Sequence, residues 1–422
     1  MQQPRGTRDL FGEELVSIRL VMRTMNDIFK RYSYEEVETP IFEYLELFTK
    51  KSGSNVVGQL YAFKDKSSRD LALRPELTAP VVRFYIQRLR STPKPVKIFY
   101  FGHCFRYEEP QARRWRQFLQ AGVEIIGSKD PAADAEVAAL SSNLMQELGF
   151  MDRELRLGHI HLLREILVHS GIREDAQDPI LRAIDSREVK RIDNEFKLAG
   201  IRSADQKLLR NLIGLRGGFS VIDKASKLLR GIPRASKALD NLREIISYLV
   251  PLGVKNISID LGIARGLDYY TGFVFEIYLD GVQVAGGGRY DGLVGNIGGE
   301  PTPAVGVGYG VDRIARAILT RGMALPTVRL DCVVLPVDDK VRAAAMEIVT
   351  ELRKAGMSVD TDFMGRTLRK AMAHANALKA SRVVVVGKKD LREGRVVLRD
   401  MGTGKQEQIP RGEIVERLKS VS

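Results

Sequence analysis

The sequence predicts an α+β domain whose antiparallel sheet is flanked by helices, with an all-α insertion inside it and a separate α/β domain after it. Three observations support this fold class. Short β-rich segments joined by charged loops occupy residues 71–127. Residues 169–251 have almost no strand pattern but several amphipathic helical ones. From residue 328 onward, strands alternate with helices of about 10–15 residues.

These patterns divide the 422 residues into three domains. The sheet domain comprises residues 1–168 and 252–322, because sheet-like sequence returns after the helical segment. The helical insertion comprises residues 169–251, and the C-terminal domain comprises residues 328–422. A stretch containing Gly322 and Pro326 is the predicted linker between the sheet domain and the C-terminal domain.

The elements of the sheet domain follow in order. A helix is predicted over residues 12–32, where apolar residues recur at spacings of three and four. The next segment is strand-like and contains Pro40. Proline has no backbone N–H to donate to a neighbouring strand, so we expect this segment at a sheet edge, a bend or a seam between subunits. Helices are also predicted over residues 77–89 and 131–150. A strand that runs into a helix closes the domain over residues 305–319.

Composition excludes several classes of protein. The chain is 44% hydrophobic, so it is not a disordered or fibrous protein. No run approaches the roughly 18 apolar residues of a membrane-spanning helix, and the N-terminal segment has charges where a signal peptide needs an apolar region. Only Cys104 and Cys332 could pair, and they lie far apart in the sequence. We therefore expect a reduced, cytoplasmic protein with no membrane association.

The chain carries an excess of positive charge. It has 66 Lys and Arg against 53 Asp and Glu, a net charge of +13. Residues 327–422 hold 19 Lys and Arg against 13 Asp and Glu, an excess of six positive charges. This balance suits a nucleic-acid partner, and a basic appended domain fits an RNA-binding module. A solvated basic surface is the alternative in both cases.

Several common motifs are absent or incomplete. There is no GxxxxGK motif, so no phosphate-binding P-loop is present. His159 and His161 are spaced like a metal pair on one face of a strand, but no Cys or third His is near them in sequence, so we expect structural histidines and no metal ligands. His103 and Cys104 would point to opposite faces of a strand, which argues against a nucleophilic Cys–His pair.

Polar residues concentrate in four segments of the sheet domain. A predicted hairpin places Arg106 and Glu108 on one face of its first strand and basic residues, among them Arg114, in its turn. Its second strand places on one face Phe118, Gln120, Gly122 and Glu124. The other segments contribute Arg74, Glu76 and Thr78 at a strand-to-helix junction, Arg265, Asp268, Tyr269 and Tyr270 before an apolar strand, and Arg313 at a helix start. Singly each segment can be a surface hairpin, a packed tyrosine or a salt bridge; together the arginines favour a polyphosphate site without a P-loop.

The motifs together resemble those of class II aminoacyl-tRNA synthetases, and within them the histidyl-tRNA synthetase family. The resemblance covers almost the whole chain: VETPIFEYLELF is similar to motif 1, FRYEEPQARRWRQF to motif 2, GVGYGVDRI to motif 3, and residues 328–422 to the anticodon-binding domain. RGLDYYTGFVFE and AGGGRYDGL resemble the two histidine-site signatures of that family. Residues 1–168 and 252–322 would then form the catalytic domain.

This resemblance implies an ATP-dependent histidine–tRNA ligase that acts as a homodimer formed through motif 1. Histidine would attack the α-phosphorus of ATP to give histidyl-adenylate and pyrophosphate, and the 3′ end of tRNA(His) would then accept the histidine. Arginines and Mg²⁺ can hold the triphosphate in line and neutralise its charge without covalent chemistry. The insertion would approach the tRNA acceptor stem.

The resemblance also implies roles for individual residues. Arg106 and Arg265 resemble the catalytic arginines that contact the α-phosphate. The residues that resemble the ATP site are Arg106, Glu108, Arg114, Phe118 and Arg313. The residues that resemble the histidine site are Glu76, Thr78, Gln120, Glu124, Arg265, Tyr269, Tyr270 and Tyr290. Glu124 and Tyr270 would bind the imidazole, which offers one donor and one acceptor. A packed core tyrosine is the alternative for Tyr290.

Two positions depart from the family pattern, and other functions compete. Leu119 stands where the family often has His or Tyr, and Asp312 where Glu is commoner. The main alternative is the non-catalytic, synthetase-like regulatory subunit of ATP phosphoribosyltransferase, which usually lacks the C-terminal domain and the arginine signatures. A class II synthetase for another amino acid and an RNA-binding scaffold are the others.

Overall fold

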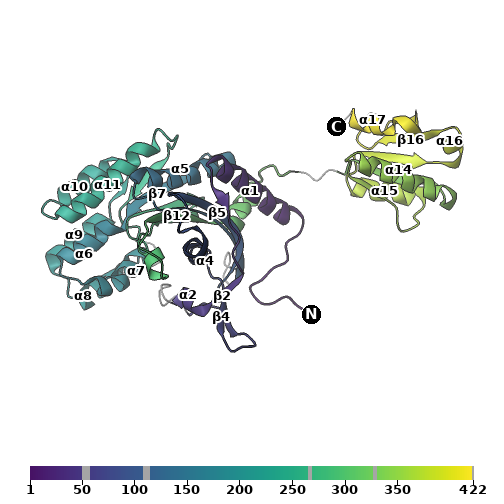
Figure 1. Cartoon of the computed structure of the whole chain (residues 1–422). Helices are drawn as coiled ribbons and strands as arrows, with labels where there is room; N and C mark the ends of the chain where they lie inside the picture. Colours follow the sequence, from purple (N-terminus) through teal and green to yellow (C-terminus); the bar gives the residue numbers. More distant parts are fainter. Residues whose placement is uncertain (50–57, 108–114, 265–268, 327–329, 421–422) are drawn as a thin grey trace. The chain divides into compact units, whose positions relative to one another are not determined.

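The computed structural model describes residues 1–49, 58–107, 115–264, 269–326 and 330–420. The chain forms two compact units, Met1–Leu325 and Pro326–Ser422. Their boundary falls within the predicted linker, and each unit has its own sheet and its own apolar core (Figure 1). The predicted ends of the insertion, at residues 169 and 251, stay a prediction.

The first unit is built on a nine-stranded sheet. Its strands, in spatial order, are β1 (Glu35–Glu36), β5 (Val96–Phe105), β6 (Gln117–Ile126), β12 (Ala304–Gly310), β11 (Val282–Arg289), β10 (Phe273–Leu279), β7 (Glu154–His159), β9 (Ile257–Asp260) and β8 (Arg216–Gly217). The central strands, from β5 to β7, are antiparallel, as the sequence predicts. The outer pairs β1–β5 and β7–β9 are parallel, so the sheet is mixed at its edges.

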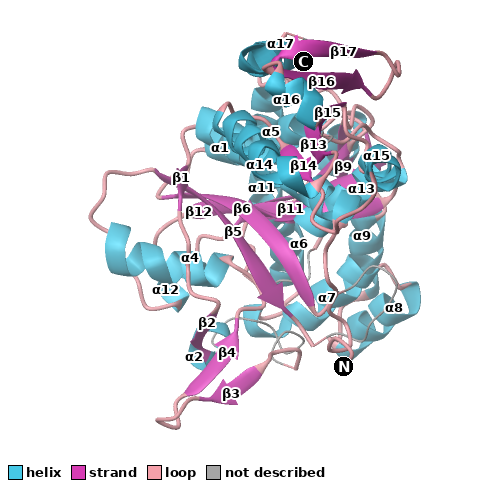
Figure 2. Cartoon of the chain, turned by 90° about the vertical axis from the view of Figure 1, so that its right-hand side faces the viewer, coloured by secondary structure: helices cyan, strands magenta, loops and turns pink. Residues whose placement is uncertain are grey.

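Helices cover both faces of this sheet. Figure 1 shows α1 (Gly12–Arg31) and α5 (Pro131–Glu147) on one face and α4 (Thr78–Phe84) on the other. α1 also packs against α13 (Val311–Thr320). The helix predicted over residues 77–89 is α4 continued by a π-helical turn, Tyr85–Leu89. In Figure 2 the β5–β6 hairpin is the longest feature of the sheet, and α12 (Leu293–Asn296) contacts α4 beside it.

The proline-bearing segment leads into a small three-stranded sheet. Its strands are ordered β2 (Phe42–Tyr44), β4 (Asp70–Leu73) and β3 (Ala62–Lys64), and α2 (Leu45–Thr49) follows β2. Pro40 precedes β2, and β2 is an edge strand, as expected for a residue that cannot donate to a ladder. Four large apolar side chains here are exposed, namely Ile41, Phe42, Tyr44 and Phe63.

Residues between β7 and β9 are mainly helical. The helices are α6 (Ile160–His169), α7 (Asp178–Ser186), α8 (Val189–Leu198), α9 (Ser203–Ile213), α10 (Ser220–Leu228) and α11 (Pro233–Leu249). The amphipathic helical pattern is continuous over residues 178–200. The structure breaks it at Arg187, which adopts a left-handed conformation with φ of 58°. α11 packs against α5, α6 and β7, so these helices share the core of the sheet.

The second unit has a five-stranded sheet of order β14-β13-β15-β16-β17. Its elements are β13 (Cys332–Pro336), α14 (Arg342–Lys354), β14 (Val359–Thr361), α15 (Leu368–Ala377), β15 (Arg382–Val386), α16 (Lys388–Arg392), β16 (Arg395–Asp400), β17 (Gln406–Pro410) and α17 (Ile414–Lys419). β14, β13 and β15 are parallel, as expected for the predicted α/β domain, whereas β16 and β17 are antiparallel. Sequence reasoning missed β17 because only Ile409 of its five residues is buried.

Phe29 lies at the centre of the packing between α1 and the sheet. It is fully buried, and its ring centroid lies 5.4 Å from Phe99 and 5.8 Å from Tyr309. We expect Phe29→Ala to lower the free energy of unfolding by about 3–5 kcal/mol, because it removes a large buried ring and leaves a cavity. Calorimetry should show this as a lower melting temperature. Phe11→Ala is the control, because Phe11 is exposed; an equal loss in both variants would contradict the packing argument.

Candidate active site

A buried carboxyl group lies at the centre of the sheet. Glu124 of β6 is 1% exposed. Tyr100 of β5 donates a hydrogen bond to its Oε1 at 2.8 Å, and Tyr290, just after β11, donates one to its Oε2. The Tyr100 hydroxyl also lies 3.4 Å from Oγ1 of Thr78, at the start of α4. Side chains from four separate elements therefore meet around one carboxyl group.

Glycines in the neighbouring strands make room for these side chains. A Cβ at Gly306 would overlap with the carboxylate of Glu124, and one at Gly122 would overlap with the ring of Tyr100. At Gly308 it would lie 2.6 Å from Nε2 of Gln120. The cross-strand register explains this, since Gly306 pairs directly with Glu124. The glycines of β12 are therefore required, because side chains of the paired strand β6 fill the space that a Cβ would occupy.

Burial sets the electrostatics of this site. Removal from water raises the pKa of Glu124 to about 8, although the hydrogen bonds from Tyr290 and Tyr100 favour its ionised form. Burial also raises the pKa of both tyrosines well above the usual value, so they stay protonated donors. A carboxyl group that titrates near neutral pH can either donate to or accept from a ligand that has one donor and one acceptor.

Glu76 and Thr78 lie at the N-terminus of α4. The backbone N–H of Thr78 donates to Oε2 of Glu76 at 2.6 Å, and that of Ala79 donates to Oε1 at 2.9 Å. Burial raises the pKa of Glu76, and these two backbone donors oppose that shift. The structure therefore brings Glu76 and Thr78 together, as the sequence suggested, but the carboxylate also caps the helix.

Gln120 shares a strand face with Glu124. Its Oε1 accepts a hydrogen bond from the thiol of Cys104 at 3.1 Å. Burial raises the pKa of the Cys104 thiol to about 12, so it is a protonated donor, and the expectation that His103 and Cys104 form no nucleophilic pair agrees with this chemistry. Cys104 pairs with Phe118 across the two strands of the hairpin. The residue that orients Gln120 is therefore the cross-strand neighbour of Phe118.

Three tyrosines form one wall of the site. The ring centroid of Tyr269 lies 4.9 Å from that of Tyr270 and 5.7 Å from that of Tyr290. Tyr270 and Tyr290 are buried. Gly288, with φ of +157°, permits this contact, because a Cβ there would lie 3.0 Å from Cδ1 of Tyr270. The two segments that resemble histidine-site signatures are therefore brought side by side.

The structure also pairs an arginine with an aromatic ring on the hairpin. The guanidinium of Arg106 lies 5.2 Å from the ring centroid of Phe118, and its Nε donates to the carbonyl of Pro75 at 2.9 Å. Arg313, on the first turn of α13, is exposed, and its Nη1 donates to the carbonyl of Gln283 at 2.8 Å. Arg265, Glu108 and Arg114, also assigned by resemblance, lie outside the described residues.

The two departures from the family pattern contact each other. Oδ2 of Asp312 accepts a hydrogen bond from the backbone N–H of Leu119 at 2.5 Å, and its Oδ1 pairs with Arg8. This hydrogen bond uses only the backbone of Leu119, whose side chain packs in the apolar core. Asp312 therefore joins the start of α13, which carries Arg313, to β6, which carries Phe118 and Gln120.

Sequence reasoning missed Tyr100 and left Arg74 without a role. Tyr100 lies two strand steps from Cys104 on the same face, so extending the alternation backward from Arg106 would have found it. Arg74 is buried and donates to the carbonyls of His103, Thr39 and Pro40, at 2.8, 2.6 and 3.1 Å. It holds the proline-bearing segment against β5.

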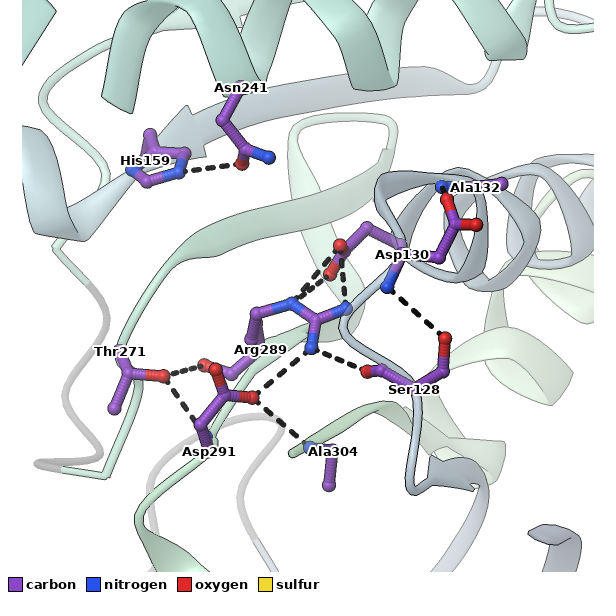
Figure 3. Close-up of polar contacts among 10 residues, drawn as sticks. Ser128, Asp130, Ala132, His159, Asn241, Thr271, Arg289, Asp291 and Ala304 are labelled. Carbon is purple, nitrogen blue, oxygen red and sulfur yellow. Dashed lines mark hydrogen bonds and ion pairs between the residues drawn. The ribbon is translucent and has the colours of Figure 1, made fainter. Parts of the chain in front are cut away.

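The HIH pair has a different geometry from the one expected. His159 ends β7 and His161 lies in α6, so the expectation that both share a strand face was wrong. His159 is buried, its Nε2 lies 3.1 Å from Oδ1 of Asn241 (Figure 3), and burial lowers its pKa to about 4. His161 pairs with Glu165 at 3.3 Å. Among the described residues, no three His, Cys, Asp or Glu side chains could together hold a metal ion.

Comparisons with known proteins agree on one family. A family model described as histidyl-tRNA synthetase matches residues 6–314, and one described as anticodon binding domain matches residues 331–421. A histidine–tRNA ligase of Methanocaldococcus jannaschii is 42% identical over 413 residues, 97% of each chain. The helices in the described part of the chain include none long and apolar enough to cross a membrane.

Two solved structures share the fold. The histidyl-tRNA synthetase of Nostoc sp. PCC 7120 superposes with a TM-score of 0.82 at 24% identity, covering 100% of this chain and 99% of that one. A protein of Bacillus halodurans, described as an ATP phosphoribosyltransferase regulatory subunit/histidyl-tRNA synthetase, has a TM-score of 0.79 at 26% identity, covering 92% of this chain and 98% of that one. The described architecture is thus that of class II synthetases, with a separate anticodon-binding domain.

Replacing Glu124 with Gln should change how stability depends on pH. Because burial raises its pKa from 4.5 to about 8, the folded state binds this proton more tightly than the unfolded state between those values. The stability contributed by the protonated carboxyl is fully present below the unfolded pKa and is lost as pH rises through the folded pKa, by roughly 5 kcal/mol at most. Calorimetry between about pH 5 and about pH 9 should therefore show Glu124→Gln gaining stability relative to wild type as pH rises.

The matched control is Glu147→Gln, which removes a carboxylate that is 40% exposed in an ion pair with Arg31. We expect the difference between this variant and wild type to change little over the same pH range. A pH-independent difference for Glu124→Gln would contradict the raised pKa.

Proposed function

The chain belongs to the histidyl-tRNA synthetase family, and we propose that it is a histidine–tRNA ligase. It activates histidine with ATP to give histidyl-adenylate and pyrophosphate, and then transfers histidine to the 3′ end of tRNA(His). One observation carries this proposal. The β5–β6 hairpin bears both a buried carboxyl group flanked by tyrosines, Glu124, and an arginine over an aromatic ring, Arg106 and Phe118.

In this proposal the tyrosine-lined part of the site binds histidine. Glu124 and Tyr270 bind the imidazole, with Tyr269 and Tyr290 as its wall. The α-amino group is bound by Glu76 and Thr78, at the start of α4, and by Gln120 of β6. A hydrogen-bonding pocket of this kind rejects analogues that leave a buried polar group unpaired, which is how a synthetase can select one amino acid.

ATP lies over the other end of the hairpin. Phe118 stacks on the adenine, Arg106 contacts the α-phosphate, and Arg313 contacts the γ-phosphate. Arg114, Arg265 and Glu108 complete the assignment from sequence resemblance. Mg²⁺ accompanies ATP and neutralises phosphate charge. Attack at phosphorus needs positioning and charge neutralisation rather than a covalent intermediate, and arginines provide both.

We also propose a cytoplasmic homodimer. The exposed apolar side chains Ile41, Phe42, Tyr44 and Phe63 cluster on the small sheet that follows Pro40, the segment that resembles motif 1. An apolar patch of this kind is typical of a protein interface. A dimer formed through it would cover the edge strand β2.

The regulatory subunit of ATP phosphoribosyltransferase is the competing function. One structural neighbour carries both descriptions, so the fold does not separate them. The chain keeps Arg106, Arg114, Arg265 and Arg313, and it has the anticodon-binding domain that such paralogues usually lack. A regulatory subunit would bind histidine without activating it.

Exchange of pyrophosphate into ATP tests the first step. We expect the purified protein to catalyse exchange with histidine and with none of the other common amino acids. Arg265→Ala should lower the exchange rate by at least about a hundredfold, because a group that neutralises transition-state charge is lost. Arg230→Ala, at an exposed position, controls for the loss of one positive charge and should match wild type. Histidine binding without any exchange would instead support the regulatory function.

Charging of tRNA tests the anticodon-binding domain. Phe363 and Met364 are 69% and 73% exposed on the loop between β14 and α15, and the exposed cations Arg369 and Lys370 follow on α15. We expect Phe363→Ala to raise the KM for tRNA(His) about tenfold, through loss of base stacking, and to leave pyrophosphate exchange unchanged. Met346→Ala removes a partly exposed side chain of the same unit and should leave both unchanged. Unaltered charging by Phe363→Ala would exclude this loop as an RNA contact.

A further inference from the structure

Arg289, at the end of β11, makes an unusually complete set of buried hydrogen bonds. Its Nε and Nη2 donate to Oδ1 and Oδ2 of Asp134 on α5, at 3.0 and 2.8 Å. Its Nη1 donates to the carbonyl of Ser128 at 2.8 Å and to Oδ1 of Asp291 at 3.1 Å (Figure 3). Arg289 is 8% exposed and Asp134 is 1% exposed. We refer to Arg289, Asp134, Asp291 and Ser128 as the Arg289 cluster.

The Arg289 cluster holds the backbone on both sides of Tyr290. Asp291, the residue after Tyr290, accepts a hydrogen bond from the backbone N–H of Ala304 at 3.2 Å and donates its own N–H to Oγ1 of Thr271 at 3.0 Å. The N–H of Thr271 donates to the carbonyl of Arg289 at 2.8 Å, and that of Tyr290 donates to the carbonyl of Ala304 at 2.8 Å. Thr271 directly follows Tyr270. The cluster therefore joins the segments that carry the two tyrosines.

Consecutive residues of this segment point to opposite faces of the sheet. Arg289 reaches α5 on one face, whereas the hydroxyl of Tyr290 reaches Glu124 on the other. A shift of Arg289 would therefore be transmitted through one peptide bond to the tyrosine that donates to Glu124. None of the hydrogen bonds described for the cluster reaches Arg106, Phe118 or Arg313.

Stability alone does not explain a buried ion pair at this position. An apolar pair of similar volume is often as stable as a buried arginine–carboxylate pair, or more stable, because both charges must leave water. What such a pair adds is a bidentate geometry that specifies one orientation. Here that orientation places the next residue against the carboxyl group of the proposed imidazole site.

We propose that Arg289, held by Asp134 and Asp291, is a positioning residue that sets the Tyr290 hydroxyl against Glu124 and so determines affinity for histidine but not for ATP. The proposal rests on the proposed function, because it assigns histidine to the site around Glu124. Displacing Tyr290 leaves the buried carboxyl with one donor fewer, which changes what Glu124 offers to an imidazole.

The test compares KM values for the two substrates in pyrophosphate exchange by the full chain. We expect Arg289→Met to raise the KM for histidine about tenfold and to leave the KM for ATP within about twofold of wild type. Arg289→Lys keeps the charge but loses the bidentate bond. Its KM for histidine should therefore lie between those of wild type and Arg289→Met. Arg289→Met and Tyr290→Phe should be non-additive in the double variant, because both act on one hydrogen bond.

Two controls separate positioning from stability. The double variant Arg289→Met/Asp134→Leu replaces the pair with apolar side chains; it should recover melting temperature lost by Arg289→Met but not the KM for histidine. Arg153 is also buried and donates to α5, through Ser142 at 3.0 Å and Gln146 at 2.7 Å. Arg153→Met should therefore lower the melting temperature and leave both KM values unchanged.

Several outcomes would overturn the proposal. These are equal increases in both KM values for Arg289→Met, a raised KM for histidine in Arg153→Met, or recovery of that KM in the apolar double variant. If wild type shows no exchange but binds histidine in calorimetry, the proposed catalysis fails while the positioning role is still tested by the dissociation constant of Arg289→Met for histidine. Absence of both exchange and histidine binding would reject the two together.

Discussion

The burial of one carboxyl group, that of Glu124, constrains much of the central sheet. A carboxyl group removed from water needs hydrogen-bond donors, and here they are hydroxyls from the strand before it and from a segment more than a hundred residues later. It also needs space, which Gly306 provides on the paired strand. These requirements explain why β5, β6, β11 and β12 must keep one register, since a shift of one residue would place the carboxyl group on the other face.

Successive side chains of a strand point to opposite faces of the sheet. One face of this sheet therefore packs in the core, and the other carries the residues of the candidate site. One face packs against α1, α5 and α13 and holds the ring cluster of Phe29, Phe99 and Tyr309. The other face carries the site residues of β5 and β6 beside α4. Arg289 and Tyr290 connect the faces, because neighbouring residues point to opposite sides. A substitution on the packed face can thus affect the site without contacting a substrate.

Local patterns in the sequence predicted what depends on local physics. The β5–β6 hairpin, the helices over residues 12–32 and 131–150, and the shared face of Gln120 and Glu124 all follow from periodicity and turn composition. Tyr100 lies on the same hairpin and could have been found by extending its alternation. The hydrogen bond from Tyr290 and the role of Arg289 could not be predicted in this way, because they depend on which distant strands pair. The break at Arg187 was missed because the sequence has no glycine at this left-handed position. The strand β17 was missed because its sequence lacks a buried face. The roles of Arg265, Glu108 and Arg114 come from resemblance alone.

The parallel edge of the sheet gives the helical segment a structural reason of its own. β7 and β9 are neighbours and run parallel, and a parallel pair cannot be closed by a tight turn; it needs a crossover of a dozen or more residues. The helices α6 to α11 lie within that crossover, and α11 packs on α5 and β7. A wholly antiparallel sheet would leave this segment as a removable addition to the domain. In the observed topology, part of the helical segment is the connection between β7 and β9 that completes the sheet. The pairing of these two strands therefore constrains where the segment begins and ends, and constrains its middle less.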